Sequence, residues 1–328
     1  MIDYYKDIIL ENNLSLKRNI EGYNFPISLS EKDFLEIIEK FREIYGDELI
    51  LLDEIDENTL NKLINAGIIT EDSKNKEAVI GFVFKDDYIL VINDKDHISI
   101  NISNFGEEIK LAYERAMEIE EDLDKKFDFS FSPQYGYLTS FGRDCGNGIE
   151  IRFKLFLFGL LDNTQAYLTL KSSLAHDGIY LTRFVPEYFK SYDDDIYILK
   201  NFGNYREKID EYLVNFENIL DTIVRNERRF RRDFQSLNGL NDEDIKDSIK
   251  ILEDNLESKN LKTMTAMINC LYDLKKYNIL GFKTKLSNQE IEYLIFNITK
   301  DKYKGNRDNE RYEFLNSYME ARWWKTIN

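Results

Sequence analysis

The sequence has very few of the residues that build cross-links, linkers or metal sites. Its 328 residues include three prolines, two cysteines and two histidines. Cys145 and Cys270 lie far apart, which excludes a disulfide framework and is typical of a protein of the reducing cytoplasm. The histidines, His97 and His176, have no ligand-like spacing relative to the cysteines, so we predict no metal site.

Long apolar runs and an excess of basic charge are also missing. No run of about eighteen apolar residues exists to span a membrane, and the acidic N-terminus MIDYYKDIIL has too short an apolar run for a signal peptide. The formal net charge is −17. Nucleic acids and anionic membranes both require a basic face, so we predict neither as a partner. These features predict a cytoplasmic protein whose acidic surface keeps it soluble.

The residues that are abundant predict a folded protein of two domains. Hydrophobic residues make up 43% and aromatic residues 14% of the chain, which excludes wholesale disorder. Helical spacing predicts helices over residues 34–41, 59–66, 107–125 and 209–234, and a short helix over 2–10, whereas residues 12–26 are predicted to be irregular. Short apolar runs predict strands over residues 78–84, 88–92, 97–102, 149–158, 166–172, 178–184 and 195–199, and a short strand or turn over 49–52. Only helices are predicted after residue 237, so we expect an α+β domain over 1–237 and an all-helical domain over 238–328.

One stretch, Gly136–Phe153, is the main candidate for a functional loop. Its sequence is GYLTSFGRDCGNGIEIRF, with glycines at 136, 142, 146 and 148. Such spacing lets a backbone close a tight turn or approach a phosphate. Asp144 and Glu150 add negative charge, however, which makes the loop a poor cradle for an anion.

Several segments, in chain order, resemble motifs of the guanidino-phosphotransferase family (arginine and creatine kinases) and are most similar to its bacterial branch, the protein-arginine kinases. The family motifs S-S-R-x-R-x-A-R-N with F-P, N-E-E-D-H-x-R and G-Y-L-T-S-C-P-T-N-x-G-T-G-x-R match residues 11–19 with 25–26, 93–99 and 136–150. Weaker matches place R-G-x-Y-G over 177–180 and E-x-x-A-R over 227–231. The resemblance implies a curved antiparallel sheet flanked by helices, followed by a helical C-terminal domain.

The resemblance also implies that the reaction site has lost its arginines and its catalytic carboxylate. Phosphoryl transfer from ATP to a guanidinium needs cations around the triphosphate and a carboxylate base. The base position falls on Lys95, beside Asp94, and the family's reactive cysteine falls on Phe141. Five positions at which the motifs have arginine are neutral or acidic here, although Arg183 lies near the last of them: Asn13, Ser15, Ser99, Glu150 and Asp177. We therefore expect no cofactor, with ATP and Mg²⁺ needed only if the protein is an active enzyme.

A further motif near the C-terminus keeps its charged residues. Arg307, Asp308 and Arg311 resemble the R-D-x-x-R-A segment of protein-arginine kinases, which implies a phosphoarginine-binding pocket. Arg307 can bind a phosphate bidentately while Asp308 pairs with the guanidinium, and Arg311 lies one helical turn further on. A solvated helix face is the alternative interpretation.

These observations favour a catalytically inactive relative of the protein-arginine kinases, a pseudokinase that acts by binding. It would regulate or adapt an arginine kinase or its activator, phosphoarginine-marked proteins, or a chaperone–protease system. One alternative is an active ATP-dependent protein-arginine phosphotransferase whose rearranged site uses Arg143, Arg152 and Arg183. Another is an assembly protein that reuses the family's dimer surface, as a homodimer or heterodimer.

Overall fold

The computed structural model describes residues 7–75, 78–106, 108–184, 195–201, 208–258, 260–299 and 307–327. The chain divides into two compact units. The sheet unit comprises Met1–Phe156, Leu168–Thr182 and Tyr197–Arg225, and the helical unit comprises Leu157–Tyr167, Arg183–Ile196 and Asn226–Asn328. This division falls within a helix rather than between residues 237 and 238, so the domain boundary proposed from the sequence stays a prediction.

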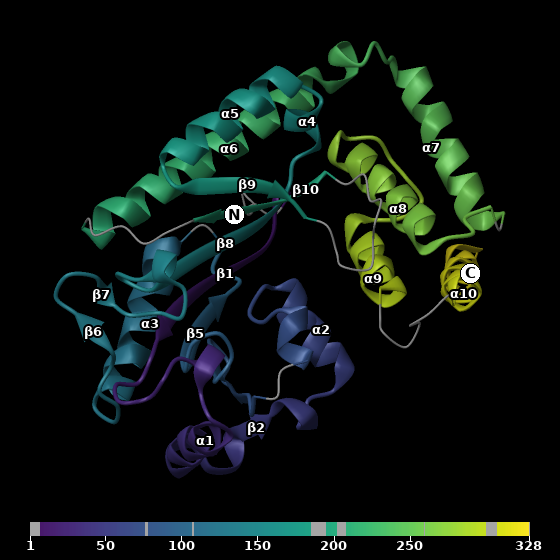
Figure 1. Ribbon diagram of the computed structural model, residues 1–328. Helices are drawn as coiled ribbons and strands as arrows, with labels where there is room; N and C mark the ends of the chain where they lie inside the picture. The colour runs from purple at the N-terminus through teal and green to yellow at the C-terminus, as the bar shows by residue number, and fades with distance from the viewer. Residues whose placement is uncertain are drawn as a thin grey trace. The chain divides into compact units, whose positions relative to one another are not determined.

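The sheet unit is built on eight strands in the order β2-β3-β4-β5-β1-β8-β10-β9 (Figure 1). The neighbouring pairs from β2 through to β8 are antiparallel. The strands are β1 (Ile9–Arg18), β2 (Leu49–Leu51), β3 (Gly81–Phe84), β4 (Ile89–Ile92), β5 (Ile98–Ser103), β8 (Ile149–Phe156), β9 (Ile179–Arg183) and β10 (Ile196–Asn201). A separate hairpin pairs β6 (Phe131–Ser132) with β7 (Gly136–Tyr137).

Ten helices accompany the strands in the described part of the chain. They are α1 (Glu31–Tyr45), α2 (Glu57–Asn65), α3 (Ile109–Asp124), α4 (Phe158–Leu161), α5 (Thr164–His176), α6 (Ile209–Leu237), α7 (Asp242–Glu257), α8 (Met264–Ile279), α9 (Asn288–Ile298) and α10 (Asp308–Ile327). Helix α1 is capped by Ser30, whose Oγ accepts from the Asp33 amide at 3.2 Å. The predicted α+β architecture followed by a helical region is confirmed.

Two predicted elements were wrong. Residues 12–18 are not irregular but belong to β1, a central strand, because Leu14 and Leu16 alternate with polar residues that bond within the sheet. Residues 166–172 form part of α5 rather than a strand; its first turn is capped by Asn163, whose Oδ1 accepts from the Ala166 amide at 3.0 Å. Of the short helix predicted over 2–10, residues 2–6 lie outside the described residues, and β1 already begins at Ile9.

The register of β1 with β5 and β8 gives the sheet one apolar face and one polar face. Leu14 and Leu16 pair with apolar residues on both sides and are fully buried on the apolar face. Helix α3 packs along this face against β1 and β5 (Figure 1), and Phe216 of α6 stacks on Phe153 of β8. The opposite face, called the polar face below, is formed by Asn13, Ser15, Lys17, Ser99, Asn101, Glu150 and Arg152.

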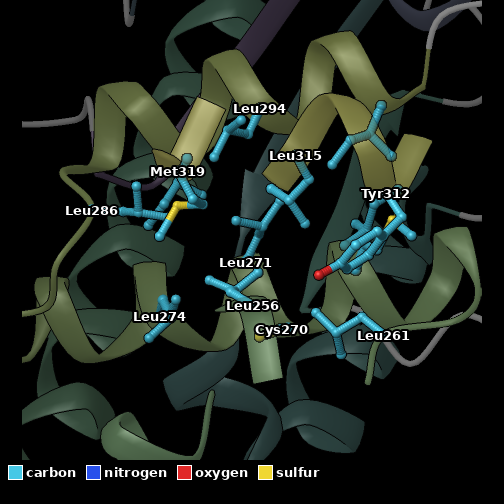
Figure 2. Packing of buried hydrophobic residues seen from close by; sticks show 14 of the residues in the cluster. Leu256, Leu261, Cys270, Leu271, Leu274, Leu286, Leu294, Tyr312, Leu315 and Met319 are labelled. Carbon is cyan, nitrogen blue, oxygen red and sulfur yellow. The ribbon is translucent and has the colours of Figure 1, made fainter. Parts of the chain in front are cut away.

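The helical unit has its own core. Side chains from α7, α8, α9 and α10 converge on Leu271, which is fully buried (Figure 2). Cys270 belongs to this core and is a free thiol, as is Cys145 in the sheet unit. Burial of this apolar surface away from water supplies the main stabilisation of the four helices.

Candidate functional site

Asn13 and Ser15, two positions with arginine in the family motif, are bonded into a side-chain network on the polar face. The Asn13 amide group donates to Ser15 Oγ at 2.8 Å and to Asn101 Oδ1 at 3.2 Å. Ser103 donates to Asn13 Oδ1 at 2.9 Å. The Asn101 amide group donates to Ser99, a third such position, at both its backbone oxygen (3.0 Å) and its hydroxyl (3.2 Å). These short polar side chains therefore bond to one another where long cations would project from the sheet.

Glu150, the fourth position, lies at the centre of a charge cluster. Lys17 donates to Glu150 Oε2 at 2.9 Å, and Lys200 of β10 lies 2.7 Å from Glu150 Oε1. Lys17 also contacts Asp144 of the glycine loop at 3.3 Å. The side chains of Lys17 and Glu150 are only 10% and 17% exposed. Acid and base thus neutralise each other within the protein, and this charge cluster is defined as Lys17, Asp144, Glu150 and Lys200.

The electrostatics of the charge cluster favour the ionised forms. Burial alone would raise the pKa of Glu150, but the adjacent Lys17 and Lys200 outweigh it and hold that pKa well below its usual range. Burial alone would lower the pKa of Lys17, yet Glu150 and Asp144 raise it above its ordinary value. A bound triphosphate would compete directly with the buried Glu150 carboxylate for the lysines.

Arg152, two residues after Glu150 in β8, also has its hydrogen-bond partners within the protein. Its guanidinium donates to the backbone oxygens of Ala66 (2.8 Å) and Asn65 (3.1 Å) at the C-terminal end of α2. Cations at this end of a helix satisfy the last carbonyl groups. Gly67 has φ +74°, and a Cβ there would lie 2.7 Å from Arg152 Nε. The glycine therefore makes room for the arginine.

The glycine loop is closed on itself by backbone contacts. Tyr137 and Gly146 exchange two backbone hydrogen bonds of 2.8 and 3.0 Å. A Cβ on Gly136 would lie 2.6 Å from the Gly146 oxygen, and both glycines have positive φ. Gly142, in contrast, has no atom within 4 Å of its Cβ position. The glycine spacing thus serves the turn geometry of the loop.

Arg18, a residue that matches the family motif, holds this loop to β1. It is 1% exposed, and it donates to Glu120 Oε1 at 2.7 Å and to the Asn147 oxygen at 2.9 Å. Its guanidinium carbon lies 3.5 Å from the centre of the Tyr137 ring. A Cβ on Gly148 would lie 2.8 Å from its Nη1. The retained arginine is therefore a structural clamp rather than an exposed anion ligand.

His97 and Asn19, which also match the motifs, connect the β4–β5 turn to the same region. His97 is fully buried; its Nδ1 accepts from the Ile20 amide at 3.0 Å, and the hydrogen bonds assign Nε2 as donor to the Asn24 oxygen at 2.9 Å. Burial lowers the pKa of His97 to about 4. Asn19 Oδ1 accepts from the His97 amide, and its side-chain amide donates to Asp96 at 2.6 Å.

Asp94 and Lys95, at the expected base position, do not form a catalytic carboxylate pair. Asp94 is buried and accepts from Ser73 at 2.7 Å. Lys95 is partly exposed and lies within the electrostatic influence of Glu150 and Asp94. Phe141, at the reactive-cysteine position, is 41% exposed. Cys145 Sγ lies near the Thr139 amide, at 3.4 Å.

The remaining predicted positions are not all gathered on the polar face. Asp177 follows α5 and is exposed. Arg143 is exposed in the glycine loop, 3.7 Å from Asp144. Arg183 belongs to the helical unit by its contacts and is exposed. Within the sheet unit, Arg143 lies beside Asp144 whereas Arg152 is bonded to the end of α2, and the use of Arg143, Arg152 and Arg183 as one site stays a prediction.

The C-terminal charged motif lies at the start of α10. Arg311 is 7% exposed, and it donates to Asp308 Oδ1 at 3.0 Å and to the Ile298 oxygen at 3.2 Å. Asp308 also accepts from the Met264 amide at 3.2 Å, which ties α10 to α8. Arg307 is about half exposed and lies 3.6 Å from Glu310. Arg307 is thus the most accessible of the three motif side chains, and phosphoarginine binding there stays a prediction.

The described residues offer no candidate for a metal centre or for a membrane span. No group of three or more histidine, cysteine, aspartate or glutamate side chains in these residues could hold a metal ion. No helix among them is long and apolar enough to cross a membrane.

Comparison with known proteins places this geometry in a family. The model of the C-terminal catalytic domain of ATP:guanido phosphotransferases matches residues 30–229. The chain belongs to the ATP:guanido phosphotransferase family. Protein-arginine kinases are similar to it: the one from Staphylococcus haemolyticus is 26% identical over 236 residues, covering 71% of this chain and 70% of the relative. That from Caldanaerobacter subterraneus is 25% identical over 244 residues, covering 71% and 72%.

Solved structures support the family fold. Lombricine kinase matches with a TM-score of 0.56 and 14% identity, over 72% of this chain and 69% of that one. The duplicated taurocyamine kinase from Schistosoma mansoni matches with a TM-score of 0.53 and 18% identity. That match covers 68% of this chain, which spans about a third (35%) of the duplicated enzyme. These structures show the fold alone.

Sequence reasoning missed the residues that occupy the site. Lys17 stands where the family motif has alanine, and Glu150 stands where it has arginine. The gain of a basic residue at the first position and of an acidic residue at the second was therefore visible in the sequence. Lys200 and the Arg152–Gly67 contact had no such signal, because their partners lie 50 and 85 residues away along the chain and meet only in the folded sheet unit.

Proposed function

We propose that this chain is a catalytically inactive protein-arginine-kinase-like protein that acts by binding. The proposal rests on a difference between the motif residues that match the family and the motif positions that have lost arginine. Arg18, Asn19, His97 and Gly148 match the family and hold the loops together. Four of the five positions at which the motifs have arginine are instead bonded to the protein's own side chains: Asn13, Ser15, Ser99 and Glu150.

Without cations arranged around the triphosphate, the site does not stabilise the transition state of phosphoryl transfer. Catalysis of that reaction depends on cations aimed at the charge of the transferring group, and removing one such donor costs about 3–4 kcal/mol of transition-state stabilisation. Here the cations on the polar face, Lys17 and Arg152, are bonded to Glu150 and to the end of α2. A triphosphate would have to displace both.

The retained fold supports a binding role for the protein. Its relatives are protein-arginine kinases, so the partner we propose is an arginine kinase or its activator, a phosphoarginine-bearing protein, or a chaperone–protease system that handles such proteins. Arg307 is the residue we assign to phosphoarginine, because its guanidinium is half exposed while Asp308 and Arg311 are bonded to each other.

Calorimetric titration with MgATP, together with a phosphate-transfer assay on protein arginine, tests the loss of catalysis. We expect no saturable nucleotide binding and no transfer. Lys17→Ala combined with Glu150→Arg restores the family residues at both positions, and nucleotide binding gained by this variant would support the electrostatic reason. Mg-dependent transfer by the unaltered protein would refute inactivity.

A peptide titration tests the binding role separately. A phosphoarginine peptide should bind and its unmodified arginine form should not, and Arg307→Ala should remove that difference. Lys246→Ala is the matched control, because Lys246 is an exposed cation on α7 of the same unit. Equal affinity for both peptides would exclude the phosphoarginine assignment.

A further inference from the structure

Helix α6 carries two exposed arginines, Arg229 and Arg232, that have no acidic partner. Within the described part of the chain, neither guanidinium forms a hydrogen bond or an ion pair. This sets them apart in a protein whose acidic residues outnumber its lysines and arginines by 61 to 44. Four other exposed arginines each lie beside an acidic side chain: Arg42, Arg143, Arg225 and Arg307.

Both arginines lie on the face of α6 that is turned away from the core. They are three residues apart, so their side chains are neighbours on the helix surface. The opposite face is buried through Phe230 and Phe234, and there Arg231 is bonded to Glu227 at 2.6 Å. The guanidinium carbon of Arg229 lies 5.0 Å from the centre of the Phe230 ring. Arg229 and Arg232 thus form a two-arginine patch on the surface of the helical unit.

The helix dipole does not account for this patch. Cations near the C-terminal end of a helix are stabilised by its dipole, but the effect falls off within the last turn. Helix α6 continues to Leu237, and its last turn contains no basic residue. Arg229 and Arg232 both lie more than one turn before that end. Neither an ion pair nor the dipole therefore balances their charge, and an anion from outside the chain can bind them.

We propose that the two-arginine patch is a docking site for an acidic segment of a partner protein. Guanidinium groups bind carboxylates through paired, charge-assisted hydrogen bonds, so neighbouring glutamates or aspartates match the patch. A short acidic segment contacts the patch alone. A nucleic acid or a second copy of the chain would also meet the rest of the surface, which belongs to a protein of net charge −17. This inference stands whether or not the protein proves to be inactive as a kinase.

Fluorescence anisotropy of a labelled hexaglutamate peptide, titrated with the full chain, tests the proposal. We expect binding that weakens as salt is added, because exposed charges are screened. Arg229→Gln combined with Arg232→Gln should weaken the affinity about tenfold or more, since hydrogen bonds to two charged groups are lost. The thermal unfolding of this variant should be unchanged, because both side chains are exposed. Absence of hexaglutamate binding to the unaltered protein would overturn the proposal.

Arg42→Gln combined with Arg115→Gln is the matched control, because it removes two positive charges from arginines that already have acidic neighbours. This control should bind the peptide as tightly as the unaltered protein does. An equal loss of affinity in both double variants would show an effect of net charge only and would contradict the docking site.

Two further measurements address the other occupants. An oligothymidine strand that bound through the two-arginine patch as tightly as hexaglutamate would overturn the assignment to an acidic protein segment. Analytical ultracentrifugation of the protein alone tests self-association. A dimer that is lost when Arg229 and Arg232 are both replaced would assign the patch to a second copy of the chain and overturn the proposal.

Discussion

Replacement of Glu150 by glutamine tests whether the charge cluster stabilises the folded protein. The change keeps the shape of the side chain and removes the negative charge between Lys17 and Lys200. Breaking a buried ion pair costs about 3–5 kcal/mol when an uncompensated charge remains. Lys17 keeps Asp144 at 3.3 Å and Lys200 is 40% exposed, so we expect a loss of about 2–3 kcal/mol in the free energy of unfolding at neutral pH.

The pH dependence gives the same prediction an independent check. The pKa of Glu150 in the folded protein lies well below its ordinary value of 4.5. A lowered folded-state pKa contributes stability that is present above the unfolded pKa and disappears as the pH falls through the folded one. The difference between Glu150→Gln and the unaltered protein should therefore shrink steadily as the pH falls below 4.5.

Urea unfolding followed by circular dichroism, at neutral pH and at several acidic values, measures both quantities. Asp122→Asn is the matched control, because Asp122 forms an exposed pair with Lys125 at 2.8 Å and should give no measurable change. A stability loss at Glu150 as small as that of the control would refute the reasoning. So would a difference that stays constant as the carboxylate titrates.

Three further predictions concern residues whose backbone conformation or burial constrains the fold. Gly67→Ala should lower the free energy of unfolding by about 2–3 kcal/mol, because it combines a positive φ with a clash against the bonded Arg152, whereas Gly142→Ala should be nearly neutral in the same urea titration. The neutral, buried His97, with a pKa of about 4 against 6.5 when unfolded, should cost the protein about 3 kcal/mol of stability as the pH falls through that window, and His97→Gln should lack this part of the pH slope. Glu227→Gln should cost about 3 kcal/mol in thermal or urea unfolding, since the buried carboxylate accepts from two backbone amides and forms a buried ion pair with Arg231; a change as small as that of Gly142→Ala would contradict this assignment.

The sequence predicted most of the sheet unit because its elements have regular local patterns. The strands near residues 78–102 and 149–158 were predicted from apolar runs, and α3 and α6 from helical spacing. Strand β1 was missed because six of its ten residues are polar, among them Asn13, Ser15 and Lys17 of the polar face. Helix α5 was missed because little of its surface is buried; Leu174 is its only buried residue in the described structure.

By itself, the sequence determined the family, the loss of arginine at the motif positions and the helical nature of the C-terminal region. Those properties depend on residue identity and short-range spacing, which a linear chain displays directly. Only the tertiary structure decided what occupies the polar face. Lys17, Glu150 and Lys200 come from three strands, and Arg152 reaches the end of α2, so their charges cancel only when the strands align. Long-range electrostatic partners have no fixed spacing, and the fold alone brings them together.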